Sequence, residues 1–536
     1  MRTPVPYDIL RFWCNPMKTA TSLSRRSFAT VLAAAPWIVR AQPAPTRARI
    51  KIDTERVIGD IDPKIYGNFI EHLGRCIEGG VFDEGSPLSG SDGFRRDVLD
   101  AAKKLNVTLL RWPGGNFSSN YNWMDGIGPR DQRPRRLEMA WGTVEDNRFG
   151  THEFMEYVEK LGTEPYFCTN LGVGSWQQAQ QWVEYCNSSE DTAMTRLRKQ
   201  NGRAQPWKVT YWGLGNEMDG PWQMGHRSAD DYGKFALEAA KLMKWTDPSI
   251  KLIAAGSSNF NPNADWTGWN RTVLEHLKHH VDYLSLHMYV GNRGNDFGEF
   301  MASSVELDSR LKTAEGIIDA ALSGEPAGRR IYIAWDEWNV WYRARGEGKE
   351  HGRRILEERY NLEDALVVAT FLNSFVNHSH IVKIANMAQL VNVIAPMFTN
   401  EKGMFLQTIY YPLQLFANNS KGKSLELFVD SPKYTSKRFG DVPYLDTSAV
   451  YDNGAFVLNV VNRHPDQAIE ADFEAQDKKF SGAVDVWEVN GPDIKAENDF
   501  DSTKVRAVQH SASAQGNRLA YSFPPHSYTM LKVRLV

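Results

Sequence analysis

The chain carries little net charge and few cysteines. Its 536 residues include 62 lysines and arginines against 65 aspartates and glutamates, a formal charge of −3 at pH 7. No basic stripe runs along the sequence, so we expect no nucleic-acid partner. The four cysteines show no metal-ligand spacing. We expect Cys76, Cys168 and Cys186 to be buried thiols, whereas Cys14 lies in an N-terminal segment of a different kind.

That N-terminal segment lacks an apolar run long enough to cross a bilayer permanently, since its run covers only residues 29–39. A twin-arginine pattern, SRRSF at 24–28, precedes the run, and a small-residue cleavage site follows it. We therefore predict that residues 1–41 are a twin-arginine signal peptide, with Met17 as an alternative to Met1 as the true start. The mature protein is expected in the periplasm or outside the cell, without a membrane anchor. The alternative is an ordinary arginine pair before a buried helix.

The stretch of residues 208–222, KVTYWGLGNEMDGPW, places an acid at the end of an apolar strand. The strand stops at two glycines, and Glu217 lies on the loop that follows. An unpaired charge is costly to bury, so an acid at this place is a poor core residue. It is a good catalytic residue, because the strand holds it rigidly while the loop opens above it. Residues 331–341, IYIAWDEWNVW, repeat this pattern with Asp336 and Glu337.

The central part of the chain alternates short apolar strands with amphipathic helical stretches, which is typical of a parallel sheet covered by helices. Eight strands are predicted at residues 64–71, 107–115, 164–171, 208–217, 250–257, 281–289, 330–339 and 381–390. Helices are predicted between them at 93–105, 151–161, 175–187, 229–244, 269–280, 305–322 and 362–377. This count predicts an α/β fold, a closed (β/α)8 TIM barrel. The alternative is an open doubly wound sheet, but no glycine-rich phosphate fingerprint follows the first strand.

Active sites of (β/α)8 barrels gather at the carboxyl ends of the strands. In this chain nearly every predicted strand ends on a side chain that can hydrogen-bond a hydroxyl group. In chain order these are Glu71, Asn116, Asn170, Asn216 with Glu217, Ser257, His287 with Tyr289, Glu337 and Gln389. We therefore place the predicted site at these strand ends.

The helical pattern fades after residue 396, and short alternating runs replace it. An Asp-Asn-Gly turn at 452–454 joins two of these runs as a hairpin. We predict an antiparallel β-sandwich over residues 397–536. The segment 47–63 begins with alternating basic and apolar residues, as a half-exposed strand does, and we expect it to join the sandwich. The barrel then occupies residues 64–396.

Glu217 and Glu337 are the pair of acids that hydrolysis of a glycosidic bond requires. If they lie about 5–5.5 Å apart, hydrolysis retains the anomeric configuration through a covalent sugar ester. One carboxylate attacks the anomeric carbon, and the other protonates the leaving oxygen and then activates water. The alternative is that one of the two is a structural ion-pair carboxylate.

Other polar residues fit supporting roles around this pair. Asn216 suits a hydrogen bond to a sugar 2-hydroxyl, although it could instead stabilise the turn. Glu71 either accepts hydrogen bonds from sugar hydroxyls or pairs with a nearby arginine. Arg111 fits the positioning of a carboxylate better than contact with substrate, and we assign His287 a supporting role as well.

Seven motifs together resemble the α-L-arabinofuranosidases of glycoside hydrolase family 51. The similarity runs from about residue 49 to the C-terminus. The motifs are FIEHLGR (69–75), RWPGGNF (111–117), YNWMDGIGP (121–129), YWGLGNEMDGPW (211–222), SLHMY (285–289), DEWNVWY (336–342) and NMAQLVNVIAP (386–396).

The resemblance implies a (β/α)8 barrel with a β-sandwich built from both ends of the chain, and retaining hydrolysis. It implies Glu217 as the acid/base and Glu337 as the nucleophile, no metal or other cofactor, and a homo-oligomer, commonly a hexamer. It implies a set of residues that hold or line the arabinose site. These are Glu71, Asn116, Asn216, Tyr289, Gln389, Trp141 and Trp341.

The sequence therefore predicts an exo-acting hydrolase that removes terminal α-L-arabinofuranosyl residues from arabinan- or arabinoxylan-type oligosaccharides. Another retaining glycosidase on the same fold, such as a β-xylosidase or an endo-β-glucanase, is the nearest alternative. A non-catalytic carbohydrate-binding protein is a further alternative. It is disfavoured because a binding protein has no use for a matched acid and nucleophile.

Overall fold

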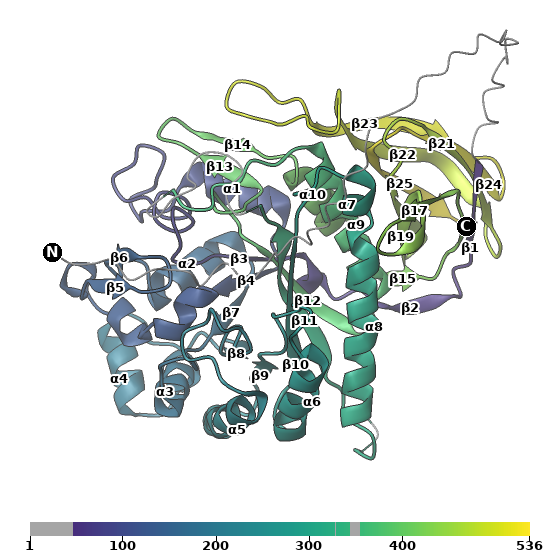
Figure 1. Cartoon of the computed structure of the whole chain (residues 1–536). Coiled ribbons are helices and arrows are strands. Elements are labelled where there is room, and N and C mark those ends of the chain that lie inside the picture. The colour runs from purple at the N-terminus through teal and green to yellow at the C-terminus, as the bar shows by residue number, and fades with distance from the viewer. Residues whose placement is uncertain (1–46, 327, 343–353) are drawn as a thin grey trace, which may run out of the picture.

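A computed structural model of the chain describes residues 47–326, 328–342 and 354–536 (Figure 1). Eight parallel strands close into a barrel, which confirms the predicted fold class. Each of them overlaps a predicted strand. In barrel order they are β3 (Gly67–Phe69), β4 (Leu109–Trp112), β7 (Glu164–Cys168), β8 (Tyr211–Leu214), β9 (Lys251–Ala254), β10 (Tyr283–Val290), β11 (Tyr332–Val340) and β12 (Val382–Ala388).

Helices surround the barrel, and seven of them match the predicted helical stretches. They are α1 (Arg96–Leu105), α2 (Thr151–Leu161), α3 (Trp176–Asn187), α5 (Ala229–Thr246), α6 (Trp266–Leu277), α8 (Ser303–Ala321) and α9 (Leu362–Asn377). Three further helices were not predicted: α4 (Ala193–Gln200), α7 (Phe297–Met301) and α10 (Tyr410–Asn419). Short 3₁₀ helices lie at η2 (Pro63–Tyr66), η3 (Asn116–Asn120), η4 (Trp123–Gly126) and η5 (Arg130–Gln132).

Helix α10 lies beyond the point where the helical pattern fades. It packs on α1, because the Tyr410 hydroxyl donates to the Ala101 carbonyl (2.9 Å) and the Asn106 amide donates to the Ala417 carbonyl (2.8 Å). Its first turn lacks a polar capping side chain, since the N-cap is Ile409. A helix start without a cap gives little sequence signal, which explains why α10 was missed.

Two sheets form the second part of the molecule, a β-sandwich beside the barrel. A four-stranded sheet has the order β16-β1-β21-β24, and a seven-stranded sheet has the order β2-β15-β19-β20-β25-β22-β23. The four strands are β16 (Phe428–Asp430), β1 (Arg47–Ile52), β21 (Ile469–Ala475) and β24 (Arg518–Phe523). The seven are β2 (Val57–Asp60), β15 (Lys423–Leu425), β19 (Leu445–Asp452), β20 (Ala455–Asn462), β25 (Ser527–Leu535), β22 (Phe480–Asn490) and β23 (Arg506–Ser513).

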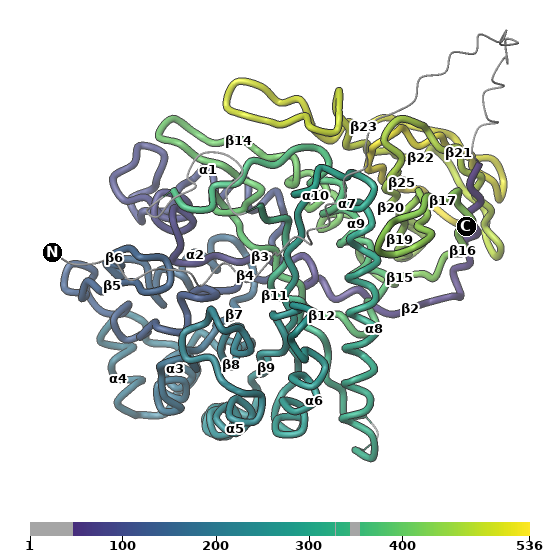
Figure 2. Tube along the Cα trace, viewed as in Figure 1, coloured from purple at the N-terminus to yellow at the C-terminus, as the bar shows by residue number. Residues whose placement is uncertain are grey.

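The N-terminal strand β1 completes the smaller sheet, as predicted, and Figure 2 shows the purple N-terminal segment running beside the yellow C-terminal part. Ala48, Ile50 and Ile52 are buried in the sandwich core, while the basic residues between them face outward. Arg47 and Arg49 pair with Glu470 and Glu474 on β21. Unlike the other sandwich pairs, β1 runs parallel to β21. The predicted 452–454 turn joins β19 to β20, and its Asn453 and Gly454 have the positive φ angles (49° and 86°) of a type I′ hairpin.

Small two-stranded hairpins lie outside the barrel sheet and the two sandwich sheets. They are β5 (Arg136–Glu138) with β6 (Thr143–Glu145), β13 (Met397–Thr399) with β14 (Met404–Leu406), and β17 (Lys433–Ser436) with β18 (Gly440–Pro443). None of the described helices combines the length and apolarity needed to cross a membrane. Cys76, Cys168 and Cys186 are free and buried, as predicted.

The barrel interior is apolar at one end and polar at the other. Seven buried residues form a cluster inside it: Leu109, Tyr166, Tyr211, Ile253, Tyr283, Ala334 and Ile384. Most of them come from the first three positions of strands that continue beyond them, and the Tyr166 hydroxyl reaches the carboxylate of Asp336. The polar residues therefore collect at the carboxyl ends of the strands, which is where the sequence places the site.

Candidate active site

Strand β8 delivers Glu217 to the barrel mouth through a tight turn. Gly215 and Glu217 both have positive φ angles, 83° and 47°. This left-handed conformation is uncommon for a residue with a side chain and is found where surrounding contacts enforce it. The next loop residues are fixed by Asp219, whose carboxylate accepts from the amides of Ser258 (2.9 Å) and Asn259 (2.8 Å) after β9. The glutamate is thus held on a rigid support.

Strand β11 delivers Glu337, and it does so through a bulge. Ala334 lies opposite Ser285 of β10, yet Glu337 lies opposite His287, so β11 contains one residue more than its neighbour over this stretch. Successive side chains of a regular strand point to opposite faces, but an extra residue breaks the alternation. As a result, both Asp336 and Glu337 contact the same residues inside the barrel, Arg111 and His287.

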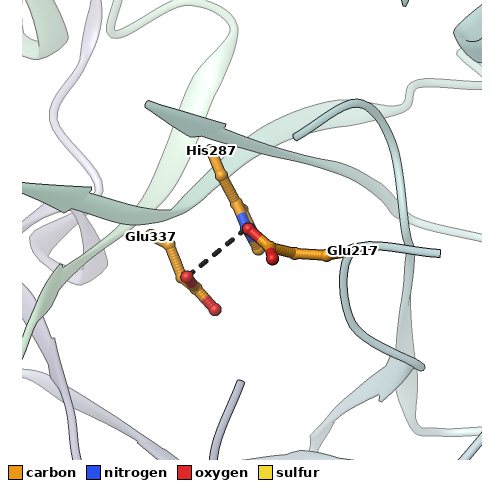
Figure 3. A group of neighbouring side chains, drawn as sticks. All are labelled: Glu217, His287 and Glu337. Carbon is orange, nitrogen blue, oxygen red and sulfur yellow. Dashed lines mark hydrogen bonds and ion pairs between the residues drawn. The ribbon is translucent and has the colours of Figure 1, made fainter. Parts of the chain in front are cut away.

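The structure brings Glu217 and Glu337 together on either side of His287 (Figure 3). His287 Nδ1 lies 3.0 Å from Glu217 Oε1 and 3.5 Å from Glu337 Oε2. One carboxylate oxygen from each glutamate and a ring nitrogen of His287 all lie within 4.8 Å of one another. This separation allows one acid to attack a sugar carbon directly while the other reaches the leaving oxygen.

His287 is held as a cation between carboxylates. Its Nε2 lies 3.3 Å from Asp336 Oδ1, so the ring bridges Asp336 to Glu217. Burial opposes protonation, but the charge of Glu337 and the contacts with Asp336 and Glu217 raise the pKa of His287 well above its usual value. Three donor atoms this close could in principle bind a metal ion. The raised pKa of His287 favours its imidazolium form, which has no free lone pair for a metal.

Arg111 on β4 is buried at the base of the site and is 1% exposed. It donates to Glu337 Oε1 (2.7 Å) and to Asn216 Oδ1 (2.6 Å). The Tyr289 hydroxyl donates to the other Glu337 oxygen (2.9 Å). Two donors on separate oxygens fix the orientation of the Glu337 carboxylate, as a nucleophile requires.

A third acid, Glu71, ends β3 beside this pair. It accepts from the backbone amide of Phe117 (3.0 Å), from the Trp141 indole (3.1 Å) and from Gln389 (2.9 Å). Burial, aided by the charge of Glu337, raises the pKa of Glu71 to about 8 despite those hydrogen bonds. Glu71 pairs with neither Arg75 nor Arg111 among the described contacts, so the ion-pair alternative is not supported.

The remaining predicted residues also lie around these acids. Asn116 opens the 3₁₀ helix η3 and follows Gly115, where a Cβ atom would lie 2.8 Å from a Glu337 oxygen, so only glycine allows this approach. Trp341, just past β11, packs edge-on against Tyr289 with ring centroids 5.4 Å apart. These residues therefore lie at the same end of the barrel as the three acids.

The polar residues at two strand ends, Asn170 and Ser257, form hydrogen bonds with backbone groups outside the site. Asn170 accepts hydrogen bonds from the amides of residues 172–174, and the Ser257 hydroxyl donates to the Trp266 carbonyl. Conversely, the sequence did not single out Trp222 as a site residue, although its indole donates to Glu217 Oε2 (2.5 Å). Trp222 lies in the 208–222 motif, but spacing alone does not show that the chain turns back there.

Asp336 was noted in the sequence only as a neighbour of Glu337. It accepts hydrogen bonds from the hydroxyls of Tyr166 (2.6 Å) and Ser285 (2.5 Å), in addition to facing His287 and Arg111. Burial would raise its pKa, but the charge of Arg111, followed by the contacts with His287 and Ser285, lowers the pKa of Asp336 to about 2. A regular strand would have turned it away from the site, so only the bulge reveals its place.

We predict that Asp336→Asn destabilises the protein by about 3–5 kcal/mol near neutral pH, because it leaves buried cations without their partner. Since the pKa of Asp336 is depressed in the folded state, its stabilisation is present above its unfolded pKa and is lost as the pH falls toward 2. The difference in Tm between wild type and variant should therefore narrow from pH 6 to pH 3.

Asp446→Asn is the matched control for this measurement. Asp446 is also paired with a buried arginine, Arg463, but burial raises its pKa instead of lowering it. Its Tm difference should not narrow over the same pH range. If the difference in Tm from wild type narrowed equally in both variants, the effect could not be assigned to the depressed pKa of Asp336.

Comparison with known proteins gives consistent matches. Residues 101–308 match the family described as "Alpha-L-arabinofuranosidase 1 domain", and residues 336–527 match "Alpha-L-arabinofuranosidase C-terminal domain". The chain is 41% identical over 499 residues to the intracellular exo-alpha-(1->5)-L-arabinofuranosidase 1 of Bacillus subtilis, covering 91% of this chain and 99% of the relative. It is 42% identical over 430 residues to the intracellular enzyme of that name from Halalkalibacterium halodurans, covering 79% and 86%.

A solved structure is similar over nearly the same span. The family 51 α-L-arabinofuranosidase from Bifidobacterium longum superposes with a TM-score of 0.86 at 31% identity, covering 92% of this chain and all of that one. The similarity thus includes both the barrel and the sandwich.

The predicted export is contradicted by these relatives. The relatives from Bacillus subtilis and Halalkalibacterium halodurans are named intracellular, which conflicts with a periplasmic or secreted protein carrying a twin-arginine signal. Residues 1–41, on which that prediction depends, lie outside the described residues. The pattern consists of one arginine pair and an apolar run of eleven residues, and such a short combination also occurs without an export function.

Proposed function

The chain belongs to the α-L-arabinofuranosidases of glycoside hydrolase family 51, and from this premise we propose a retaining, exo-acting hydrolase with Glu337 as nucleophile and Glu217 as acid/base. Its proposed substrates are oligosaccharides of the arabinan or arabinoxylan type, from which it removes terminal non-reducing α-L-arabinofuranosyl residues. The observation that carries the proposal is the convergence of the two glutamates on His287, with an oxygen of each within 4.8 Å of the other.

The reaction proceeds in two displacements. In the first, Glu337, held ionised by Arg111 and Tyr289, forms a bond to the anomeric carbon as the bond to the leaving oxygen breaks. Glu217 gives its proton to that oxygen. In the second, Glu217 takes a proton from water, the water oxygen bonds to the anomeric carbon, and the ester to Glu337 breaks. Two inversions give an arabinose product of retained configuration.

Two buried polar atoms support the proposed sugar contacts. Asn216 Nδ2 and Gln389 Oε1 have no hydrogen-bond partner within the described part of the chain, although both residues are at most 2% exposed. Buried polar groups are normally paired, so these atoms suit ligand hydroxyls. We assign Asn216 to the 2-hydroxyl, and Glu71, Asn116, Tyr289 and Gln389 to other parts of the sugar.

Trp141 and Trp341 complete the proposed site as apolar walls. Their rings can cover the C–H faces of a furanose, while the indole of Trp141 keeps its hydrogen bond to Glu71. The supporting residues Arg111 and His287 act on the two catalytic acids and not on the sugar. This division follows from their contacts, which go to carboxylates and to Asn216.

Substrate preference tests the proposal. We expect the purified chain to release the aryl group from an aryl α-L-arabinofuranoside at least 100-fold faster, by kcat/KM, than from the matching aryl β-xyloside, because a site built to pair hydroxyls rejects a mismatched sugar. NMR of the first-formed product should show the retained anomer. Faster release from the xyloside would favour the alternative glycosidase, and no release from either would favour a binding protein.

We further propose that the chain assembles as a homo-oligomer, a hexamer by analogy with its family. Light scattering coupled to size-exclusion chromatography measures the assembly, and a mass of one chain, 60.8 kDa, would contradict it. The division into a barrel of residues 64–396 and a sandwich of residues 47–63 with 397–536 is likewise a proposal. Limited proteolysis would test these boundaries.

A further inference from the structure

We propose that Glu138, on the hairpin β5–β6 at the barrel mouth, is a positioning residue that holds Trp141 in place against Glu71 and thereby sets the affinity for the sugar. The inference rests on the proposed function, since it takes Trp141 and Glu71 as parts of the sugar site. Glu138 itself uses both carboxylate oxygens on backbone amides and is not placed in contact with substrate.

The carboxylate of Glu138 caps the turn that carries Trp141. Its Oε1 accepts from the amide of Ala140 (2.6 Å) and its Oε2 from the amide of Trp141 (2.5 Å), while its own carbonyl accepts from Gly142 (3.2 Å). Three hydrogen bonds to one residue close the loop between the two strands. The direction of the Trp141 backbone is therefore set by Glu138.

Apart from Trp141, which packs against the barrel core, burial of apolar surface does not hold this hairpin in place. Leu137, Met139 and Val144 are 72%, 50% and 50% exposed, so the apolar face of the hairpin points to solvent. Strands of three residues are too short to be stable by themselves. Polar contacts therefore fix the rest of the hairpin. Each of them contributes more to its stability than a single contact does in a well-packed loop.

Four polar contacts fix the hairpin β5–β6 in the described structure. At the start of the hairpin, Arg136 pairs with Asp125 (2.8 Å). At its end, Glu145 pairs with His72 (3.0 Å), the residue next to Glu71. At the tip, the Trp141 indole donates to Glu71, and behind the tip lies the Glu138 cap. Of the four, only the cap acts on the backbone of Trp141 itself.

Glu138 is also an unusual capping acid, because it is 4% exposed and has no ion-pair partner among the described residues. The net pKa of Glu138 is raised to about 7. Burial raises it most, and the charge of Glu145 also raises it, whereas the two capping amides and the charge of His72 lower it. Its charge in turn contributes to the raised pKa of Glu71. A protonated Glu138 has only one full acceptor for the two amides, so the cap weakens on the acid side of pH 7.

Glu138→Gln tests the inference, because an amide keeps the shape but can accept only one of the two hydrogen bonds. For an aryl α-L-arabinofuranoside at pH 8, we expect KM to rise about tenfold and kcat to change less than threefold, since a loss of uniform sugar binding changes KM alone. Glu138→Asp, which keeps the carboxylate, should restore KM to within about threefold of wild type. The matched control is Asp499→Asn, since Asp499 caps the amides of residues 501 and 502 in a turn of the C-terminal part.

The pH dependence separates positioning from a general loss of structure. The ratio of the KM of Glu138→Gln to that of wild type should be smaller at pH 6 than at pH 8, because the raised pKa of Glu138 favours its protonated form at the lower pH. An unchanged KM of Glu138→Gln at pH 8 would overturn the inference.

Hydrogen exchange provides a readout independent of turnover. The amides of residues 138–142 should exchange at least tenfold faster in Glu138→Gln than in wild type, with Tm within 2 °C, whereas Asp499→Asn should leave them unchanged. If wild type proves inactive on arabinofuranosides but the exchange result holds, the proposed function fails and the positioning of Trp141 stands. Equal exchange in wild type and variant refutes the positioning even if wild type is active.

Discussion

Glu337→Ala should lower kcat on an aryl α-L-arabinofuranoside by about 10⁴-fold or more, which corresponds to a loss of roughly 5.5 kcal/mol of transition-state stabilisation. The reason lies in the contacts of this carboxylate. Arg111 and Tyr289 each donate to one of its oxygens, and this arrangement holds an ionised acid beside Glu217.

Binding should survive the same substitution. Of the residues assigned to the sugar, Tyr289 donates to Glu337, but Glu71, Asn216 and Gln389 are held by contacts that include none with Glu337. We expect calorimetry to show oligosaccharide binding by Glu337→Ala within about tenfold of wild type. Retained binding with lost turnover separates a nucleophile from a residue that shapes the site.

The control for this experiment is Glu357→Gln. Glu357 is also a buried glutamate paired with an arginine, since Arg75 Nε donates to it at 2.6 Å. It should lower Tm but leave kcat within about threefold. Full activity of Glu337→Ala would contradict the mechanism, and an equal loss in both variants would show that the effect comes from disturbed folding.

The fold was accessible from the sequence because its signals are local and repeated. Each barrel strand is a short apolar run, and β1 alternates three buried apolar residues with three basic ones. These patterns depend on burial alone, and burial is what a periodic sequence encodes. Helix α10 was not predicted because its start has no polar cap and because its partner α1 is about 300 residues away in the sequence.

The site was accessible only in part, for a geometric reason. The strand ends located Glu71, Glu217, Glu337 and Gln389, because an acid or amide at such a place is exceptional. The roles of Asp336 and Glu138 depend on features that leave no local mark. One is a bulge that turns two consecutive residues inward, and the other is a hairpin tip folded back on the barrel.

Glu217→Ala should affect substrates unequally, and this inequality identifies the acid/base. An arabino-oligosaccharide has a poor leaving group that needs the Glu217 proton, so kcat/KM should fall by about 10³-fold. An aryl arabinofuranoside with a strongly acidic phenol leaves without that proton, so its kcat/KM should fall less than tenfold. Release of the ester to Glu337 still needs a base, and a burst of phenol followed by a slow steady state should therefore appear.

Azide then distinguishes the two acids by stereochemistry. In Glu217→Ala, azide can enter the space left by the carboxylate and attack the ester from the side of the leaving group, which gives an arabinosyl azide of retained configuration and a faster steady state. In Glu337→Ala, azide would replace the nucleophile and give the inverted azide. NMR of the product reads out the difference, and inverted azide from Glu217→Ala would exchange the two assignments. The contacts predict against that exchange, because Arg111 and Tyr289 donate to both oxygens of Glu337 and hold this carboxylate in place for attack.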